Sequence, residues 1–135
     1  MKAKFQRAFT LAEILIVVAV IALIAAIAIP NMVKARALAN DSMAESTLTA
    51  VAKVMEQYRV SHDSYPTEMS DLTNVPPPYL NKDYSSGTYY GFSFVSTLGA
   101  GGYSLQANPV TPGVTGTKAY TVTTGGKISE EPATP

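Results

Sequence analysis

The most constraining feature of this 135-residue chain is an apolar run near its start. The run is unbroken from Ile14 to Ile29, and from Phe9 to Ile29 it covers 21 residues of which only Thr10 and Glu13 are polar. At about 1.5 Å of rise per residue, a helix of this length is roughly 30 Å long, which matches the hydrocarbon thickness of a bilayer. We therefore predict that residues 9–29 form a membrane-spanning helix.

A short basic segment precedes this helix. It contains Lys2, Lys4 and Arg7 and no acidic residue. Such segments stay on the cytoplasmic side of a membrane, so we expect the residues after the helix to lie outside. The other 127 residues hold seven basic and ten acidic side chains, a net charge of −3, which gives no indication of nucleic-acid binding.

Glu13 is the residue in the apolar run that needs an explanation. A charged side chain within a membrane helix costs about 2.5–3.5 kcal/mol on insertion scales, so such residues usually have a function. One interpretation is that Glu13, near the end of the run, reaches the lipid headgroups. The other is that a positive charge from a neighbouring copy of the chain neutralises it.

The sequence Phe-Thr-Leu-Ala-Glu at residues 9–13, with its basic leader and with Pro30 after the apolar run, resembles the N-terminal signature of type IV pilins and pseudopilins. The resemblance implies that prepilin peptidase removes a leader of residues 1–8 by cutting between Ala8 and Phe9, and then methylates the amino group of Phe9. It also implies that Glu13 pairs with the terminal amine of an adjacent subunit. The family usually has Gly before the cut, so Ala8 predicts slower or tolerated cleavage.

This resemblance implies a homo-oligomeric helical filament built by inner-membrane assembly machinery. The precursor is expected to span the inner membrane once, and the filament to be extracellular or periplasmic. A pseudopilin of a type II secretion system remains an alternative, although the predicted last strands lack the acidic residues of a calcium-binding loop. A single-pass membrane-anchored binding module is a further alternative. An ordinary signal peptide is disfavoured because the apolar run exceeds the usual 7–15 residues or so.

After the apolar run the pattern becomes amphipathic over residues 30–61. Pro30 cannot donate a backbone hydrogen bond, so we expect it to kink or open the helix around Ile24–Ile29. Lys34 and Arg36 are interpreted either as interfacial anchors or as partners between subunits. One face of this helix is apolar, at spacings of four, three, four and three: Ala44, Leu48, Val51, Met55 and Tyr58. The side chains expected off that face are Glu45, Thr49, Lys53, Glu56 and Arg59.

Residues 62–128 are predicted to form a globular β-sheet domain with a connecting loop, and residues 129–135 a flexible acidic tail. Three or four antiparallel strands are expected, covered by the apolar helix face, which gives an α+β pilin fold. A helical turn over 66–72 would be capped by Thr67. The strands are predicted at 88–95, 102–108, 118–124 and 127–128, joined by a hairpin loop at 97–101 and a turn at Gly125-Gly126.

The sequence offers no catalytic set. It contains no cysteine, and its single histidine, His62, is expected to be solvated near the end of the helix. The ten acidic residues do not have the spacing of metal ligands, and no glycine-rich loop has the context of a phosphate site. We therefore predict a protein that is not an enzyme and that has no metal and no cofactor.

Overall fold

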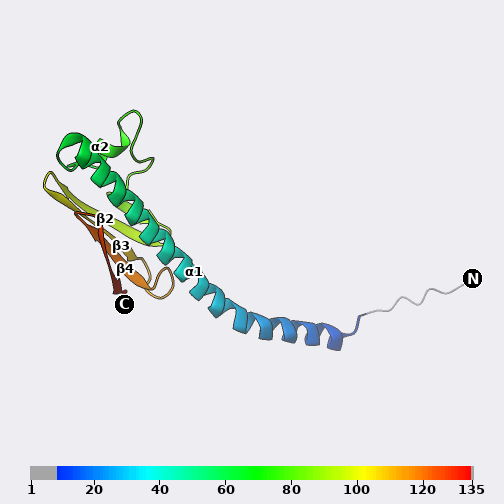
Figure 1. The fold of residues 1–135 in the computed structure, drawn as a ribbon. Helices are drawn as coiled ribbons and strands as arrows, with labels where there is room; N and C mark the ends of the chain where they lie inside the picture. Colours follow the sequence, from blue (N-terminus) through cyan, green and yellow to red (C-terminus); the bar gives the residue numbers. More distant parts are fainter. Residues whose placement is uncertain (1–8, 135) are drawn as a thin grey trace, which may run out of the picture. The chain divides into compact units, whose positions relative to one another are not determined.

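A computed structural model describes residues 9–134, which fall into two units that divide between Val33 and Lys34. The predicted leader, including Ala8, lies outside the described residues. The helices are α1, Leu11–His62, and α2, Ser70–Thr73. The strands are β1 Ser86–Tyr89, β2 Phe92–Gly99, β3 Gly102–Pro109, β4 Lys118–Thr123 and β5 Lys127–Pro132 (Figure 1).

The long predicted helix is confirmed as α1, which has 52 residues. It begins at Leu11, two residues later than expected, and ends one residue later, at His62. Pro30 lies inside it, and Ile24–Ile29 remain α-helical, so the predicted opening of this segment is not present. Proline removes only one hydrogen bond of the ladder, the one to the carbonyl of Ala26, and the neighbouring bonds can hold the turn.

The α+β architecture is confirmed, but the sheet of the 34–134 unit has five strands instead of three or four, in the antiparallel order β1-β2-β3-β4-β5. The single strand predicted at 88–95 is a hairpin, because the chain reverses at Tyr90 and Gly91. Their φ angles are 54° and 77°, the left-handed values that a tight hairpin turn requires. The hairpin loop predicted at 97–101 is also shorter, since β2 continues to Gly99.

The predicted flexible tail is wrong from Ser129 to Pro132, because these residues belong to β5. This strand pairs with β4 in an antiparallel ladder, in which Lys127 lies opposite Thr123 at one end and Pro132 lies opposite Lys118 at the other. Lys118 Nζ lies 2.9 Å from Glu130 Oε2. That hydrogen bond to Glu130 raises the pKa of Lys118 above its usual value. The side chains of β5 are nearly all exposed, so backbone pairing with β4 stabilises a strand that hydrophobic alternation does not reveal.

The helical turn predicted over 66–72 is present only in part, because α2 begins at Ser70, and Thr67 does not cap it. The residue before α2, Met69, makes no side-chain capping bond. Instead Asp71 Oδ2 accepts hydrogen bonds from the backbone N–H groups of Thr67 and Glu68, both at 3.2 Å. A carboxylate in the first turn thus satisfies donors before the helix, the role that sequence reasoning gave to a hydroxyl.

The predicted apolar face of α1 covers the sheet. Tyr58 is partly buried against the resulting core. The buried residues on that face are Ala44, Leu48, Val51 and Met55, and the sheet and loop residues in the same core include Phe92, Phe94, Leu105, Val122 and Leu72. This core therefore joins the second half of α1 to β2, β3 and β4.

Two carboxylates of α1 also join the helix to the sheet. Asp41, which is buried, accepts from Thr117 N at 2.9 Å and from Thr117 Oγ1 at 2.6 Å. Glu56, predicted to lie off the packed face, accepts hydrogen bonds from the Tyr65 hydroxyl at 3.0 Å, the Tyr103 hydroxyl at 3.1 Å and Gly125 N at 2.8 Å. In a chain without cysteines, these two carboxylate contacts supplement packing and strand pairing.

Candidate assembly site at the start of the long helix

Glu13 lies in the first turn of α1, where Thr10 is its partner. Glu13 Oε2 accepts from Thr10 N at 2.8 Å and from Thr10 Oγ1 at 3.0 Å. In return Thr10 Oγ1 accepts from Glu13 N at 3.2 Å. This reciprocal arrangement is a capping box, in which the cap hydroxyl and the third-position carboxylate satisfy each other's backbone donors.

The capping box changes the explanation of Glu13. The sequence led us to expect a partner for the carboxylate in the headgroups or in another chain, and the structure adds Thr10 as a partner within the same chain. The signal was present in the sequence, because Thr10-Leu11-Ala12-Glu13 has the spacing of a capping box at the start of an apolar run. The box holds the carboxylate at the N-terminal end of the helix, where it bonds to the N–H of Thr10, the residue that follows Phe9.

The structure places the other predicted site residues separately. Phe9 is 85% exposed and precedes the helix, so it can meet another molecule. Pro30 is 20 residues beyond Thr10, about 30 Å along the helix, and does not join Phe9 and Glu13 in one site. The candidate site therefore consists of Phe9, Thr10 and Glu13.

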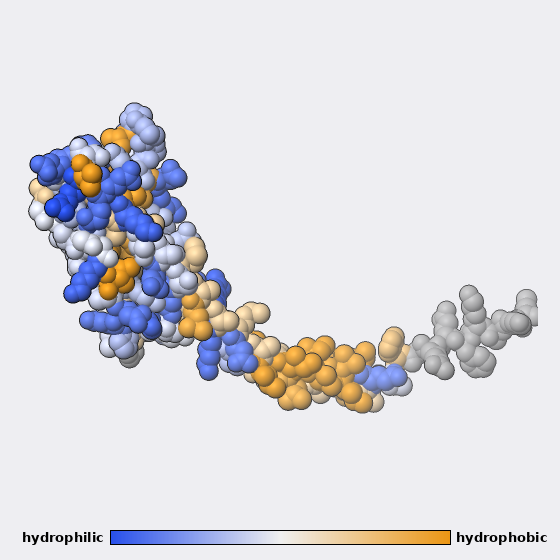
Figure 2. Space-filling model, viewed as in Figure 1, coloured by the Kyte–Doolittle hydropathy of each residue, from blue (hydrophilic) through white to orange (hydrophobic). Residues whose placement is uncertain are grey.

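The residues around this site present an apolar surface. Every side chain from Leu11 to Val33 is exposed except the half-buried Ala25 and Val33. Figure 2 shows this part of the helix as a continuous hydrophobic surface that begins beside the polar first turn. This segment is long and apolar enough to cross a membrane. A surface of this kind requires lipid or other apolar helices around it.

The described residues show no competing centre of reactive groups. Among residues 9–134, no three His, Asp or Glu side chains are grouped as metal ligands would be. His62 is exposed, as expected, and its ring stacks on Tyr58 with 4.0 Å between centroids. The tyrosines include buried members such as Tyr103, whose pKa is raised above its usual value, chiefly by burial and then by its hydrogen bond to Glu56.

Comparison with known proteins identifies the family. The profile described as "Prokaryotic N-terminal methylation motif" matches residues 3–29. The profile described as "Type IV minor pilin ComP, DNA uptake sequence receptor" matches residues 30–121, more than half of the chain. The chain belongs to the type IV pilin family. The two matches meet within α1, so this pilin has the family's pattern along both its membrane half and its domain half.

Curated relatives of this pilin come from several filament systems. It is 39% identical over 69 residues to the type IV wide pilus major component PilA4 of Thermus thermophilus, covering 51% of this chain and 53% of the relative. It is 30% identical over 88 residues to the type II secretion system core protein G of Escherichia coli, covering 62% and 61%. It is 32% identical over 94 residues to the type IV major pilin protein PilA of Myxococcus xanthus, covering 70% and 39%.

The pilin thus spans between 39% and 61% of the length of these three relatives. Their names describe components of pili or of a secretion system, and none of the three is named as an enzyme.

Proposed function

We propose that this pilin is a structural subunit of a type IV pilus-like filament, polymerised through α1. The observation that carries the proposal is the placement of one carboxylate, Glu13, at the N-terminal end of an exposed apolar helix. The methylation motif at residues 3–29 supports removal of residues 1–8 by prepilin peptidase, with cleavage between Ala8 and Phe9 and methylation of Phe9.

The first step of the proposed mechanism is storage in the inner membrane. Residues 11–33 offer lipid a surface with almost no burial inside the protein. The basic leader holds the N-terminus in the cytoplasm, and the 34–134 unit is outside. While the subunit is stored in the membrane, Thr10 donates two hydrogen bonds to the Glu13 carboxylate. These bonds reduce the free-energy cost of placing the carboxylate at the edge of the lipid.

The second step is transfer from lipid to other subunits. Inner-membrane assembly machinery lifts the subunit, and its apolar helix exchanges lipid for the helices of neighbouring subunits. The small side chains of this segment allow close approach of helices, which association in lipid requires. They are Ala12, Ala19, Ala22, Ala25, Ala26 and Ala28.

The third step fixes the vertical position of the new subunit. After cleavage, the methylated amine of Phe9 carries a positive charge, and Phe9 is exposed. An adjacent subunit's Glu13 can accept a hydrogen bond from that amine, with a free carboxylate lone pair in addition to those that Thr10 uses. Desolvation offsets much of the attraction between two charges in an apolar environment, so this pair specifies register more than it adds stability.

A pseudopilin of a type II secretion system is the second candidate, favoured by the similarity to protein G of Escherichia coli. The DNA uptake named in the ComP profile is not extended to this chain. Its domain, from Lys34 onward, has seven basic and nine acidic side chains, and this net negative charge does not favour binding to nucleic-acid phosphates.

The test compares Glu13→Gln with Glu45→Gln, which changes an exposed carboxylate in the domain half of the same helix. In cells with the assembly machinery, we expect Glu13→Gln to abolish or greatly reduce sheared filaments in electron micrographs while the subunit stays in the membrane fraction. Glu45→Gln should assemble normally. The intact mass of the wild-type subunit should show loss of residues 1–8 and gain of one methyl group.

Two results would contradict the proposal. Normal filaments from Glu13→Gln would remove the pairing role, and a subunit that begins at Met1 in a functional assembly would remove the processing step. Electron microscopy of wild-type cells also distinguishes the two candidates, because a pilus extends from the cell surface and a pseudopilus of normal length does not.

A further inference from the structure

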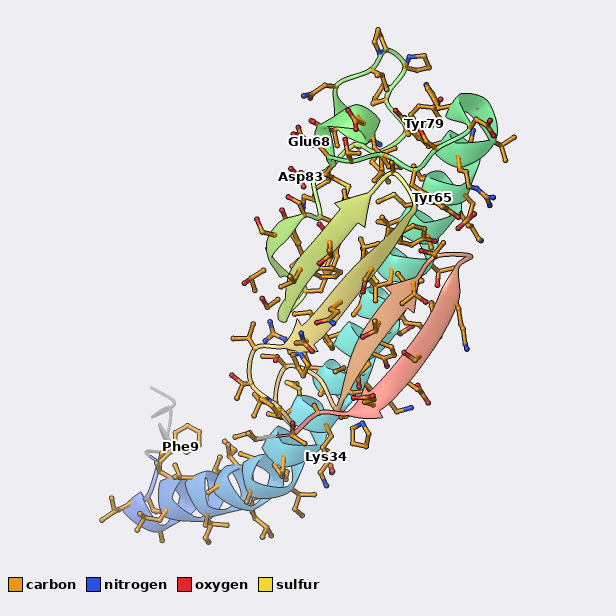
Figure 3. The ribbon with its side chains drawn as sticks, turned by 90° about the vertical axis from the view of Figure 1, so that its left-hand side faces the viewer. Phe9, Lys34, Tyr65, Glu68, Tyr79 and Asp83 are labelled. Atoms are coloured by element: carbon orange, nitrogen blue, oxygen red, sulfur yellow. The ribbon has the colours of Figure 1, made fainter. Side chains whose placement is uncertain are left out.

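The end of the 34–134 unit at which α1 enters it is built from α1 and two loops. Asn40 Nδ2 donates to the carbonyl of Thr115, in the β3–β4 loop, at 2.9 Å. A Cβ added at Gly91, in the β1–β2 turn, would lie 3.2 Å from Asn40 Nδ2 and 2.9 Å from Thr115 Cβ. Both loops therefore contact α1 six residues after Lys34, and Figure 3 labels Lys34 at this end of the unit.

Four large apolar side chains at this end are exposed, and we call them the proximal rim. They are Leu38 at 61%, Tyr90 at 45%, Val110 at 56% and Val114 at 50% exposure. A patch of such side chains on a soluble surface usually marks a contact with another protein or a membrane.

The loops hold the rim side chains in place. Val110 N donates to Gly91 O at 3.0 Å, which joins the β3–β4 loop to the β1–β2 turn. Within the loop, Val114 N donates to Thr111 O at 3.1 Å and Gly113 N to Gly116 O at 2.8 Å. These backbone bonds order the loop that carries Val110 and Val114, both of which are exposed.

The rim begins close to the membrane-spanning residues along the chain. α1 is helical across Val33 and Lys34, and Leu38 follows Lys34 by about 6 Å of helix. A headgroup layer is roughly 5–8 Å thick on each side of the hydrocarbon. Lys34 and Arg36 are exposed, and a tyrosine such as Tyr90 is a residue that membrane interfaces favour.

The charges near the rim are compatible with this environment. The buried carboxylate of Asp41 is directed to Thr117 and does not face solvent. Glu130 pairs with Lys118, and Glu131 is exposed on the edge strand β5. The charged side chains nearest in sequence to the span are the basic Lys34 and Arg36, and the apolar Leu38 follows them.

We propose that the proximal rim is a lipid-contact surface, seated in the phospholipid headgroup layer while the subunit is stored in the membrane. The proposal rests on the membrane storage proposed above. A phospholipid surface is the occupant we infer, because the span tethers every stored subunit to one within a few residues of Leu38, the first member of the rim, whereas a second copy must arrive by diffusion. Assembly must then release the rim as well as the helix.

The chain has no cysteine, so single-cysteine variants of the processed full-length subunit can carry one nitroxide label each. Val114→Cys reports on the rim. Val60→Cys is the matched control, because Val60 is 88% exposed and lies 26 residues after Lys34, about 39 Å along the helix. Both labelled variants are reconstituted in phosphatidylglycerol–phosphatidylcholine vesicles. Power-saturation electron paramagnetic resonance then compares how often each nitroxide collides with oxygen, which is enriched in lipid, and with a water-soluble nickel chelate.

We expect the ratio of oxygen collisions to nickel collisions to be higher for the label at position 114 than for the label at position 60. Adding Val110→Glu to the Val114→Cys variant should shift its label toward the value at position 60. Equal values at positions 114 and 60 would overturn the proposal. Shielding from both reagents that disappears when the protein is diluted in lipid would also overturn it, since a second copy would then cover the rim.

The same vesicles separate this inference from the proposed function. A subunit that alkaline carbonate extracts from the vesicles would not be stored in the membrane at all, and both proposals would fail. A subunit that resists extraction but has a water-exposed rim would contradict the lipid contact alone.

Discussion

Glu56 provides the most direct test of how this domain is held to its helix. The Glu56→Ala variant removes the acceptor for three donors: the hydroxyls of Tyr65 and Tyr103 and the N–H of Gly125, at 3.0, 3.1 and 2.8 Å. These donors come from the segment after α1, from β3 and from the β4–β5 turn. The loss of one carboxylate therefore affects three separate parts of the domain.

The size of the effect follows from the exposure of each donor. A hydrogen bond to a charged group contributes about 1.5–3 kcal/mol when its loss leaves a buried partner unsatisfied. Tyr65 and Tyr103 are both 5% exposed, but Gly125 is exposed and can bind water after the substitution. Glu56 itself is only half-buried, which lowers each contribution. The expected loss is roughly 3 kcal/mol, which for a domain of this size lowers the melting temperature by about 12 °C.

The measurement is thermal unfolding of the processed subunit in detergent micelles, followed by the near-ultraviolet circular dichroism of its tyrosines. The chain has eight tyrosines and no tryptophan, so this signal reports on the domain and not on the membrane half of α1. Glu45→Ala is the matched control, with an exposed carboxylate on the same helix, and should change stability by less than about 0.5 kcal/mol. If Glu56→Ala has the same melting temperature as that control, the reasoning from these hydrogen bonds is refuted.

Two further predictions concern the same domain. Burial and the hydrogen bond to Glu56 raise the pKa of Tyr103, so the folded domain keeps a proton that the unfolded chain releases above about pH 10. The stability that the Tyr103 hydroxyl contributes is complete below that pH and declines as the pH rises further. Tyr103→Phe should therefore make the fall in melting temperature with rising pH less steep. An unchanged dependence of melting temperature on pH would exclude Tyr103 as a cause. Gly116→Ala should lower the free energy of unfolding, measured in urea, by about 1–3 kcal/mol, because the added Cβ would overlap Phe92 and lie 2.9 Å from Asp41 Oδ1. The control Gly101→Ala should leave the free energy of unfolding unchanged, because a Cβ there would meet no atom within 4 Å.

Periodicity was sufficient to predict the helix and its packing. The apolar run and the 3–4 spacing from Ala44 to Tyr58 gave both ends of α1 to within two residues and the face that meets the sheet. These signals are strong because the first half of the helix is apolar all round and the second half is apolar on one side only. The family signature at residues 9–13 pointed to Phe9 and Glu13 as candidate assembly residues, but it did not predict the hydrogen bond between Thr10 and Glu13.

The missed features depend on contacts that sequence periodicity does not encode. The turn at Tyr90 and Gly91 lies within an aromatic run that resembles one strand, and β5 exists through backbone pairing with β4. Glu56 was predicted to lie off the packed face of the helix, yet donors from far along the chain reach its half-buried position. Such contacts become visible only when the tertiary neighbours are known.

The turn between β2 and β3 has a practical consequence for engineering. Ala100 O accepts from Tyr65 N at 3.2 Å, which places the turn beside the segment after α1, at the opposite end of the domain from Asn40 and its loops. A Cβ added at Gly101 would meet no atom within 4 Å. A peptide epitope inserted there would project clear of the sheet, so the turn is a natural position for displaying a foreign sequence at regular intervals along a fibre.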